Sequence, residues 1–183
     1  MMKKTILISA ILFAVLVAGL IFLRVKAKSF SPESNVDFID GNLKVHVFYN
    51  RPYKKGREIF GKLVPYGKPW RTGANEPTVF ETNQDLSFGD KKLKAGKYSL
   101  WTVPEEQNWQ IIFNSSVPWW GINFNGETLR DPAADALVLE AQVHHPQDKV
   151  FEQFTISIEK SNDGMELVLF WDNTVVAVPF NSK

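Results

Sequence analysis

The sequence predicts an all-β protein, an antiparallel β-sandwich of jelly-roll type, preceded by one N-terminal transmembrane helix. Short strand-like segments follow one another at regular spacing after Phe30, with Asp, Asn and Gly turn signals between several of them. A single uninterrupted apolar run lies near the N-terminus, and no later segment shows convincing helical periodicity. We therefore expect two parts: residues 1–29 as a membrane anchor or signal segment, and residues 30–183 as one extracytoplasmic β-sandwich domain.

The first element is the apolar run. Lys3 and Lys4 precede nineteen uncharged, mostly apolar residues from Thr5 to Leu23, and basic residues resume at Arg24. At ~1.5 Å per residue a helix of this length extends about 28 Å, close to the roughly 30 Å hydrocarbon core of a bilayer. The alternative is a cleaved secretory signal, but its apolar region has only ~7–15 residues and ends in small residues. We favour a retained single-pass anchor through residues 5–23.

The charges on the two sides of this run are nearly balanced, so the positive-inside rule does not settle its orientation. We expect a short cytoplasmic tail and an exported domain, in the periplasm, because the domain looks like other exported β-domains. The chain has no cysteine, which excludes a lipid-attachment cysteine, a disulfide framework, a thiol nucleophile and a thiolate zinc site.

The next elements are strands. Leu43, Val45, Val47 and Tyr49 alternate with polar residues, the period of a strand with one buried face. Turn chemistry at residues 162–164 and 172–174 predicts that the last three strands form a meander. The segment from Ser31 to Asn35 is expected to be a short linker. The other expected strands are Thr78–Thr82, Leu86–Phe88, Tyr98–Val103, Trp109–Asn114, Leu137–Val143, Phe154–Lys160, Met165–Trp171 and Val175–Phe180.

One long stretch, Asn50 to Pro77, is not strand-like and is rich in Gly, Pro and basic residues. The exported part has a net charge of −4. The stretch Asn50 to Pro77 alone has a net charge of +5, so the rest of the exported part has −9. Nucleic acid is therefore not an expected partner of the domain. The localised basic charge has two interpretations, a solvated loop that pairs with the acidic scaffold or a patch that attracts anions.

The candidate ligand-binding residues lie mainly in this stretch. Arg51, Arg57 and Arg71 carry planar guanidinium groups that bind carboxylate or phosphate bidentately, although they can equally tie the loop to the scaffold. The run of residues 70–76 gathers polar groups around a glycine. Tryptophans in loop-like sequence are candidates for stacking on a ligand ring or for plugging the end of the sandwich. From these two features the further candidates are Trp70, Thr72, Asn75, Glu76 and Trp120.

No metal site or cofactor is expected. His144 and His145 are adjacent and would point to opposite faces of an extended chain, and His46 lies on a separate strand. No serine lies in a strained Gly-x-Ser-x-Gly turn, and the glycine pattern of a phosphate loop is absent. Catalytic residues therefore stay unknown, with Glu76 as the obvious acid/base candidate if the protein is an enzyme.

Several runs together give the chain a family resemblance, from about Ser31 to Phe180. It resembles the bacterial family known as domain of unknown function 2911. That resemblance implies an exported all-β domain and no established activity, and it supplies no catalytic residues. The runs that carry it are Arg51-Pro52, Gly56-Arg57, Ile59-Phe60-Gly61, Leu63-Val64-Pro65-Tyr66-Gly67, Trp70-Arg71-Thr72-Gly73-Ala74-Asn75-Glu76, Ala95-Gly96-Lys97-Tyr98-Ser99-Leu100, Trp120-Gly121 and Asn173-Thr174.

On these grounds we expect a membrane-anchored binding module for an anionic or carbohydrate-like small ligand. Two alternatives stay open: an enzyme that acts on such a ligand, and an envelope structural or assembly protein that meets another protein through the basic loop.

Overall fold

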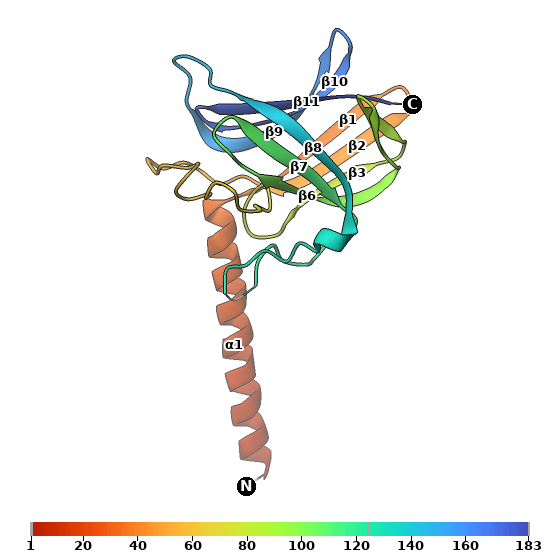
Figure 1. The fold of residues 1–183 in the computed structure, drawn as a ribbon. Helices are drawn as coiled ribbons and strands as arrows, with labels where there is room; N and C mark the ends of the chain where they lie inside the picture. Colours follow the sequence, from red (N-terminus) through yellow and green to blue (C-terminus); the bar gives the residue numbers. More distant parts are fainter. Residues whose placement is uncertain (1, 124, 183) are drawn as a thin grey trace.

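The computed structural model describes residues 2–123 and 125–182, so Met1 and Lys183, the outer ends of the two expected parts, lie outside it. It shows one long N-terminal helix followed by a β-domain (Figure 1). Helix α1 comprises Met2–Phe30. The strands are β1 (Glu33–Asp40), β2 (Leu43–Asn50), β3 (Thr78–Thr82), β4 (Leu86–Phe88), β5 (Lys91–Leu93), β6 (Gly96–Val103), β7 (Asn108–Asn114), β8 (Asp135–His144), β9 (Phe151–Ser161), β10 (Gly164–Asp172) and β11 (Thr174–Ser182). The expected all-β class with one apolar helix before it is confirmed.

Helix α1 projects away from the β-domain (Figure 1), and its large apolar side chains between Ile6 and Phe30 are exposed. The portion from Ile6 to Phe30 is long and apolar enough to cross a membrane. The helix ends at Phe30 because Pro32 disfavours helical backbone at the residue before it, Ser31. The Ser29 hydroxyl donates to the Lys26 carbonyl at 2.7 Å in the last turn.

All strand pairs are antiparallel, in the order β1-β2-β3-β6-β7-β8-β11-β10-β9, and the short β4-β5 hairpin joins through β11. The last three strands form the expected meander, with β10 between β9 and β11. Because β8 pairs with β11 and not with β9, these four strands have Greek-key order. Greek keys are the units of jelly rolls, so the topology is compatible with the expected sandwich.

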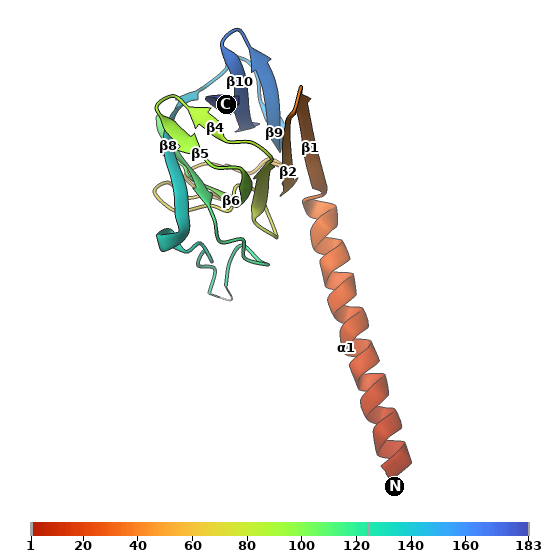
Figure 2. The ribbon, with the colours of Figure 1, turned by 90° about the vertical axis from the view of Figure 1, so that its right-hand side faces the viewer.

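The sheet curls until its two ends nearly meet, which makes it almost a closed barrel (Figure 2). The hydroxyl of Tyr49 on β2 accepts from the Ile156 amide of β9 at 3.1 Å, and it lies 3.4 Å from the Ile156 carbonyl. At the other end of the same seam, Lys160 forms an ion pair with Asp40 at 2.8 Å. The interior of the curl is filled by the buried apolar faces of the strands.

One sequence expectation was wrong at the start of the domain. Residues 31–35 were expected to be a linker, but β1 begins at Glu33 and pairs with the whole of β2. The strand lies at the end of the sheet, and only Val36 and Phe38 pack, partly buried, on the core. The rest of its sequence is polar apart from the exposed Ile39, and Glu, Ser, Asn and Asp are uncommon in strands, so its apolar alternation is weak.

Candidate functional site

The stretch Asn50–Pro77 folds over the end of the barrel from which α1 emerges, and it is anchored at several points. Tyr53 forms a bridge with Gln153 of β9, and Trp70 exchanges two backbone hydrogen bonds with Thr102 of β6, at 2.7 and 2.9 Å. Within the stretch, the side chains of Ile59 and Val64 are buried. The stretch is therefore a structured cover on the barrel.

Trp70 is at the centre of an aromatic cluster under this cover. Its side chain is 9% exposed, and its Nε1 donates to the Gly73 carbonyl at 2.9 Å. It stacks at 18° on Trp171, with ring centroids 6.1 Å apart, and meets Phe154 edge-on at 4.9 Å. Phe60 and Trp109 complete the cluster. Only a small part of this indole faces outward, so its main contacts are with the core.

Thr72 and Asn75 hold the backbone of the run 70–76. Thr72 is fully buried, and its hydroxyl lies 3.3 Å from the Thr102 hydroxyl. Asn75 lies 3.5 Å from the Asn50 side chain. Both residues have positive φ, 54° for Thr72 and 58° for Asn75, which is uncommon for a threonine. The surrounding contacts stabilise this turn, and they leave Thr72 no exposed surface for a ligand.

Hydrogen bonds to protein oxygens fix Arg51 and Arg57. Arg51 donates through Nε to the Phe154 carbonyl at 3.2 Å and through Nη2 to the Thr155 hydroxyl at 2.7 Å, which ties the cover to β9. Arg57 donates through Nε to the Lys54 carbonyl at 3.0 Å and through Nη2 to the Tyr53 carbonyl. Arg57 is nevertheless exposed, and within the described residues its Nη1 has no hydrogen-bond partner.

Glu76 joins the cover to the end of α1. Its carboxylate accepts from Lys28 at 2.7 Å, from Arg24 at 3.2 Å and from the fully buried Asn50 at 3.1 Å. Lys28 also pairs with Glu33. Partial burial alone would raise the pKa of Glu76, but the hydrogen bonds from Lys28, from its own backbone N–H and from Asn50, with the charge of Lys28, hold that pKa below its usual value. Glu76 is thus an ionised, paired carboxylate, a setting that does not favour a general acid at neutral pH.

This pairing predicts a pH dependence of stability. A carboxylate whose folded-state pKa is lowered stabilises the fold above its ordinary pKa of about 4.5, and that contribution is lost as the pH falls through the folded value. Glu76→Gln is expected to lower the free energy of unfolding by about 1–2 kcal/mol at pH 7. The difference from wild type should shrink toward pH 3. Thermal unfolding of the full chain in detergent micelles measures both, with Glu81→Gln on the exposed face of β3 as the control; an equal effect of the two changes would contradict the assignment.

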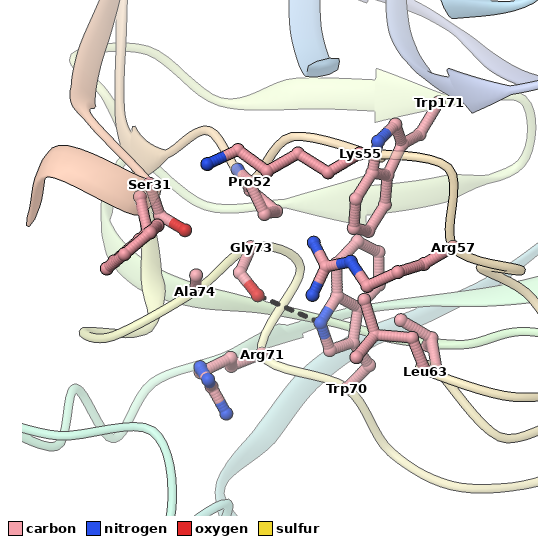
Figure 3. A pocket seen from close by; sticks show the side chains of 12 residues that line it. Ser31, Pro52, Lys55, Arg57, Leu63, Trp70, Arg71, Gly73, Ala74 and Trp171 are labelled. Carbon is pink, nitrogen blue, oxygen red and sulfur yellow. Dashed lines mark hydrogen bonds between the residues drawn. The ribbon is translucent and has the colours of Figure 1, made fainter. Parts of the chain in front are cut away.

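A hollow of about 510 Å³ lies between the end of α1 and the cover, and we call it the base hollow (Figure 3). Its floor includes the stacked indoles of Trp70 and Trp171, and Lys55 and Arg57 lie on its rim. No acidic residue of the described part of the chain lines it. Its lining consists of Phe30, Ser31, Pro52, Lys55, Arg57, Leu63, Val64, Trp70, Arg71, Gly73, Ala74 and Trp171.

Three residues that line the base hollow carry polar donors, which differ in how they are placed. Trp171 is only 1% exposed, and its buried Nε1 has no hydrogen-bond partner among the described residues. The Nζ of Lys55 lies over the Phe30 and Tyr53 rings, with 4.6 and 5.7 Å to their centroids. The hydroxyl of Ser31 points into the hollow in Figure 3. Donors and cations over an aromatic floor suit an anionic ligand with a flat or apolar portion.

Arg71 differs from the other two arginines. Its guanidinium points away from Arg57 in Figure 3, and the residue also lines a second hollow together with Lys68 and Glu127. Its Nε is buried without a partner, and burial lowers its pKa. Its stem passes over Gly121, where an added Cβ would lie 2.1 Å from the Arg71 Cδ. The Trp120-Gly121 and Trp70-Arg71 runs, far apart in the sequence, thus meet through a close approach that only glycine permits.

Trp120 is half-buried and tilts against Trp119, with ring centroids 5.9 Å apart. The two indoles line a hollow with Glu76 and with Leu23 and Arg24 of α1. Trp120 is therefore brought near Glu76 but not to the base hollow. The eight candidates consequently divide: Arg57, Trp70 and Arg71 line the base hollow, Glu76 and Trp120 line the hollow beside α1, and Arg51, Thr72 and Asn75 support the cover.

Sequence reasoning missed Lys55, Ser31 and Trp171 as lining residues of the base hollow, and it missed Lys28 as the partner of Glu76. Lys55 is one of the basic residues of a stretch for which a solvated loop was one interpretation, and Trp171 ends an expected strand. Only the fold shows that β10 and the cover share one face. Among the residues that the structure describes, no group of three or more His, Cys, Asp or Glu side chains could hold a metal ion.

Comparison with known proteins yields a family but no characterised relative. No curated protein and no solved structure gives a significant match to the chain. A family model described as "Protein of unknown function (DUF2911)" matches residues 31–180, which is essentially the whole β-domain and excludes α1. The matched region contains the cover, the run 70–76 and the Trp120-Gly121 pair that packs on it. The resemblance carried by those runs is thereby confirmed: the chain belongs to this family of proteins of unknown function.

Proposed function

We propose that this protein is a membrane-anchored, extracytoplasmic module that binds a small anionic ligand in the base hollow. The observation that carries the proposal is the lining itself: cations at Lys55 and Arg57 and a buried, unpartnered indole N–H at Trp171, with no acidic residue among the lining side chains. A volume of about 510 Å³ is within the range of small-molecule sites.

The ligand's chemistry follows from these groups. Arg57 is already oriented by two backbone carbonyls, so little side-chain entropy is lost when its remaining N–H groups bind an anion. The Trp70 and Trp171 indoles form part of an apolar floor, which suits the apolar side of a sugar acid or of another ring that bears a carboxylate or phosphate. A neutral sugar lacks the charge that Lys55 and Arg57 would recognise.

Membrane anchoring is supported by α1. Its apolar side chains are exposed over a length that matches a bilayer, and water is an unfavourable environment for so much apolar surface. The β-domain lies at the C-terminal end of this helix, after the basic residues Arg24, Lys26 and Lys28. A short N-terminal cytoplasmic tail would then place the base hollow outside the cytoplasm, close to the membrane.

The test is a thermal-shift comparison on the full chain in detergent micelles, with glucuronate, inorganic phosphate and glucose. Glucuronate or phosphate is expected to raise the unfolding temperature, whereas glucose, which shares the ring but not the charge, is not. Lys55→Gln and Arg57→Gln should each lower the affinity for the stabilising anion about tenfold or more, because each removes a charge-assisted hydrogen bond.

The matched control is Lys62→Gln, since Lys62 lies in the same cover but does not line the base hollow. Equal stabilisation by glucose would contradict the role of charge. Anion binding that survives both Lys55→Gln and Arg57→Gln would place the site elsewhere, and the absence of any anion effect would contradict the proposal.

A further inference from the structure

The connection from β7 to β8 carries the most exposed large apolar side chain of the described β-domain. We call its residues 115–123 and 125–131 the tryptophan loop. Trp119 in this loop is 82% exposed, and Val117 and Leu129 are also exposed. Figures 1 and 2 show that the loop lies below the barrel, on the same side as the N-terminal end of α1. An indole so open to water is unfavourable unless another phase covers it.

The loop is linked in space to the boundary of the apolar run. Trp119 and Trp120 line one hollow together with Leu23, Arg24 and Ala27 of α1. Leu23 is the last residue of the uncharged run and Arg24 is the first cation after it. In a helix that spans a bilayer, this change from apolar to basic marks the boundary between hydrocarbon and headgroups. The two indoles therefore lie beside that boundary.

The chemistry of tryptophan matches that location. Its ring is apolar and its N–H is polar, which is why tryptophans collect at membrane–water interfaces. The loop carries one cation, Arg130, against the two acids Glu127 and Asp131, and Arg130 is already paired with Asp135. Insertion would accordingly depend on the indoles and not on anionic lipid. A second copy of the chain is a poorer occupant, because the hollow is shared with α1, which lipid would surround.

We propose that the tryptophan loop inserts Trp119 into the headgroup layer of the same bilayer that α1 spans, so that the domain contacts the membrane at two points. This inference rests on the proposed membrane anchoring. The ion pairs of Glu76 with Lys28 and Arg24 hold α1 against the domain, so the loop is kept at the height of Leu23 and Arg24. The membrane contact in turn fixes which way the base hollow faces.

The experiment uses the absence of cysteine in the chain. Single cysteines are introduced as Val117→Cys in the loop, Phe13→Cys in α1 and Asp163→Cys in the β9–β10 hairpin, which lies at the far end of the domain in Figure 1. Each is labelled with an environment-sensitive fluorophore in phosphatidylcholine nanodiscs that contain lipids spin-labelled near the headgroup or deep in the chain. Val117→Cys leaves both indoles in place.

The expected result is at least threefold stronger quenching by the shallow label at position 117 than at position 163, and quenching by the deep label at position 13. Adding Trp119→Ser to Val117→Cys should remove most of the shallow quenching, and Trp119 is exposed enough that this change spares the fold. If position 117 behaves like position 163 while position 13 is quenched, the loop inference is wrong and the anchor stands. If position 13 is not quenched, the anchoring is wrong and the inference is overturned with it.

Discussion

Replacing Trp70 with alanine is expected to lower the free energy of unfolding by about 3–5 kcal/mol in the absence of any ligand. The indole is 9% exposed, stacks on Trp171 and meets Phe60, Trp109 and Phe154 edge-on or nearly so. Its removal leaves a cavity in that cluster and deprives the Gly73 carbonyl of its donor. Denaturant unfolding of the full chain in micelles, followed by circular dichroism, measures the loss.

Trp119→Ala is the matched control, because it deletes the same side chain from a position that is 82% exposed. In micelles its effect on unfolding should stay within about 0.5 kcal/mol. A Trp70→Ala protein as stable as the control would contradict the structural role and return Trp70 to the function of a stacking platform for the ligand.

Gly73→Ala is expected to destabilise the protein by about 2–4 kcal/mol, through strain at a backbone conformation that L-residues rarely adopt and through a backbone clash. Gly73 has φ of +154°, and an added Cβ would lie 2.9 Å from the carbonyl oxygen of Asn50. This oxygen belongs to the backbone, so it cannot turn aside as the end of a flexible side chain could, and the Thr78 hydroxyl would lie 3.3 Å away. The run 70–76 would have to shift, and the contacts of Asn50 with Glu76 and Lys28 would shift with it.

Gly56→Ala separates the two causes. Gly56 has φ of +68° but nothing within 4 Å of an added Cβ, so only the conformational cost of about 1 kcal/mol is expected there. Thermal unfolding of both variants gives the comparison. Equal losses would mean that the approach of Asn50 is not the cause, and no loss at Gly73 would contradict the described turn.

The parts of the fold that the sequence predicted are those with strong local signals. The alternation from Leu43 to Tyr49 and the turn at residues 162–164 each determine a strand or hairpin from neighbouring residues alone, and both are confirmed. The β1 strand was missed because its mostly polar sequence gives no local strand signal. It is a strand because it pairs with β2 at the end of the sheet, and that pairing cannot be read from its own residues.

The site was harder to predict because its residues come from distant parts of the chain. The run 70–76 was recognised as important, but nothing local shows that Thr72 is buried against Thr102 while Arg57 stays at the surface. The Glu76–Lys28 pair joins residues 48 positions apart, across what looked like a boundary between anchor and domain. Charge counts cannot reveal such pairs, since they depend on how the chain returns to the end of α1.

The β-domain contacts the last turns of α1 through Glu76 and the base hollow, so proteolytic cleavage at the end of the helix would alter both. Cutting the chain before Ser31 would remove Phe30, a wall of the base hollow, and would take Lys28 and Arg24 from Glu76, which would keep Asn50 as its side-chain partner. The trimmed domain would carry an uncompensated carboxylate beside a wider, more open hollow. A leader peptidase acting there would therefore do more than release the domain from the membrane: it would change the charge and shape of what the released domain can hold.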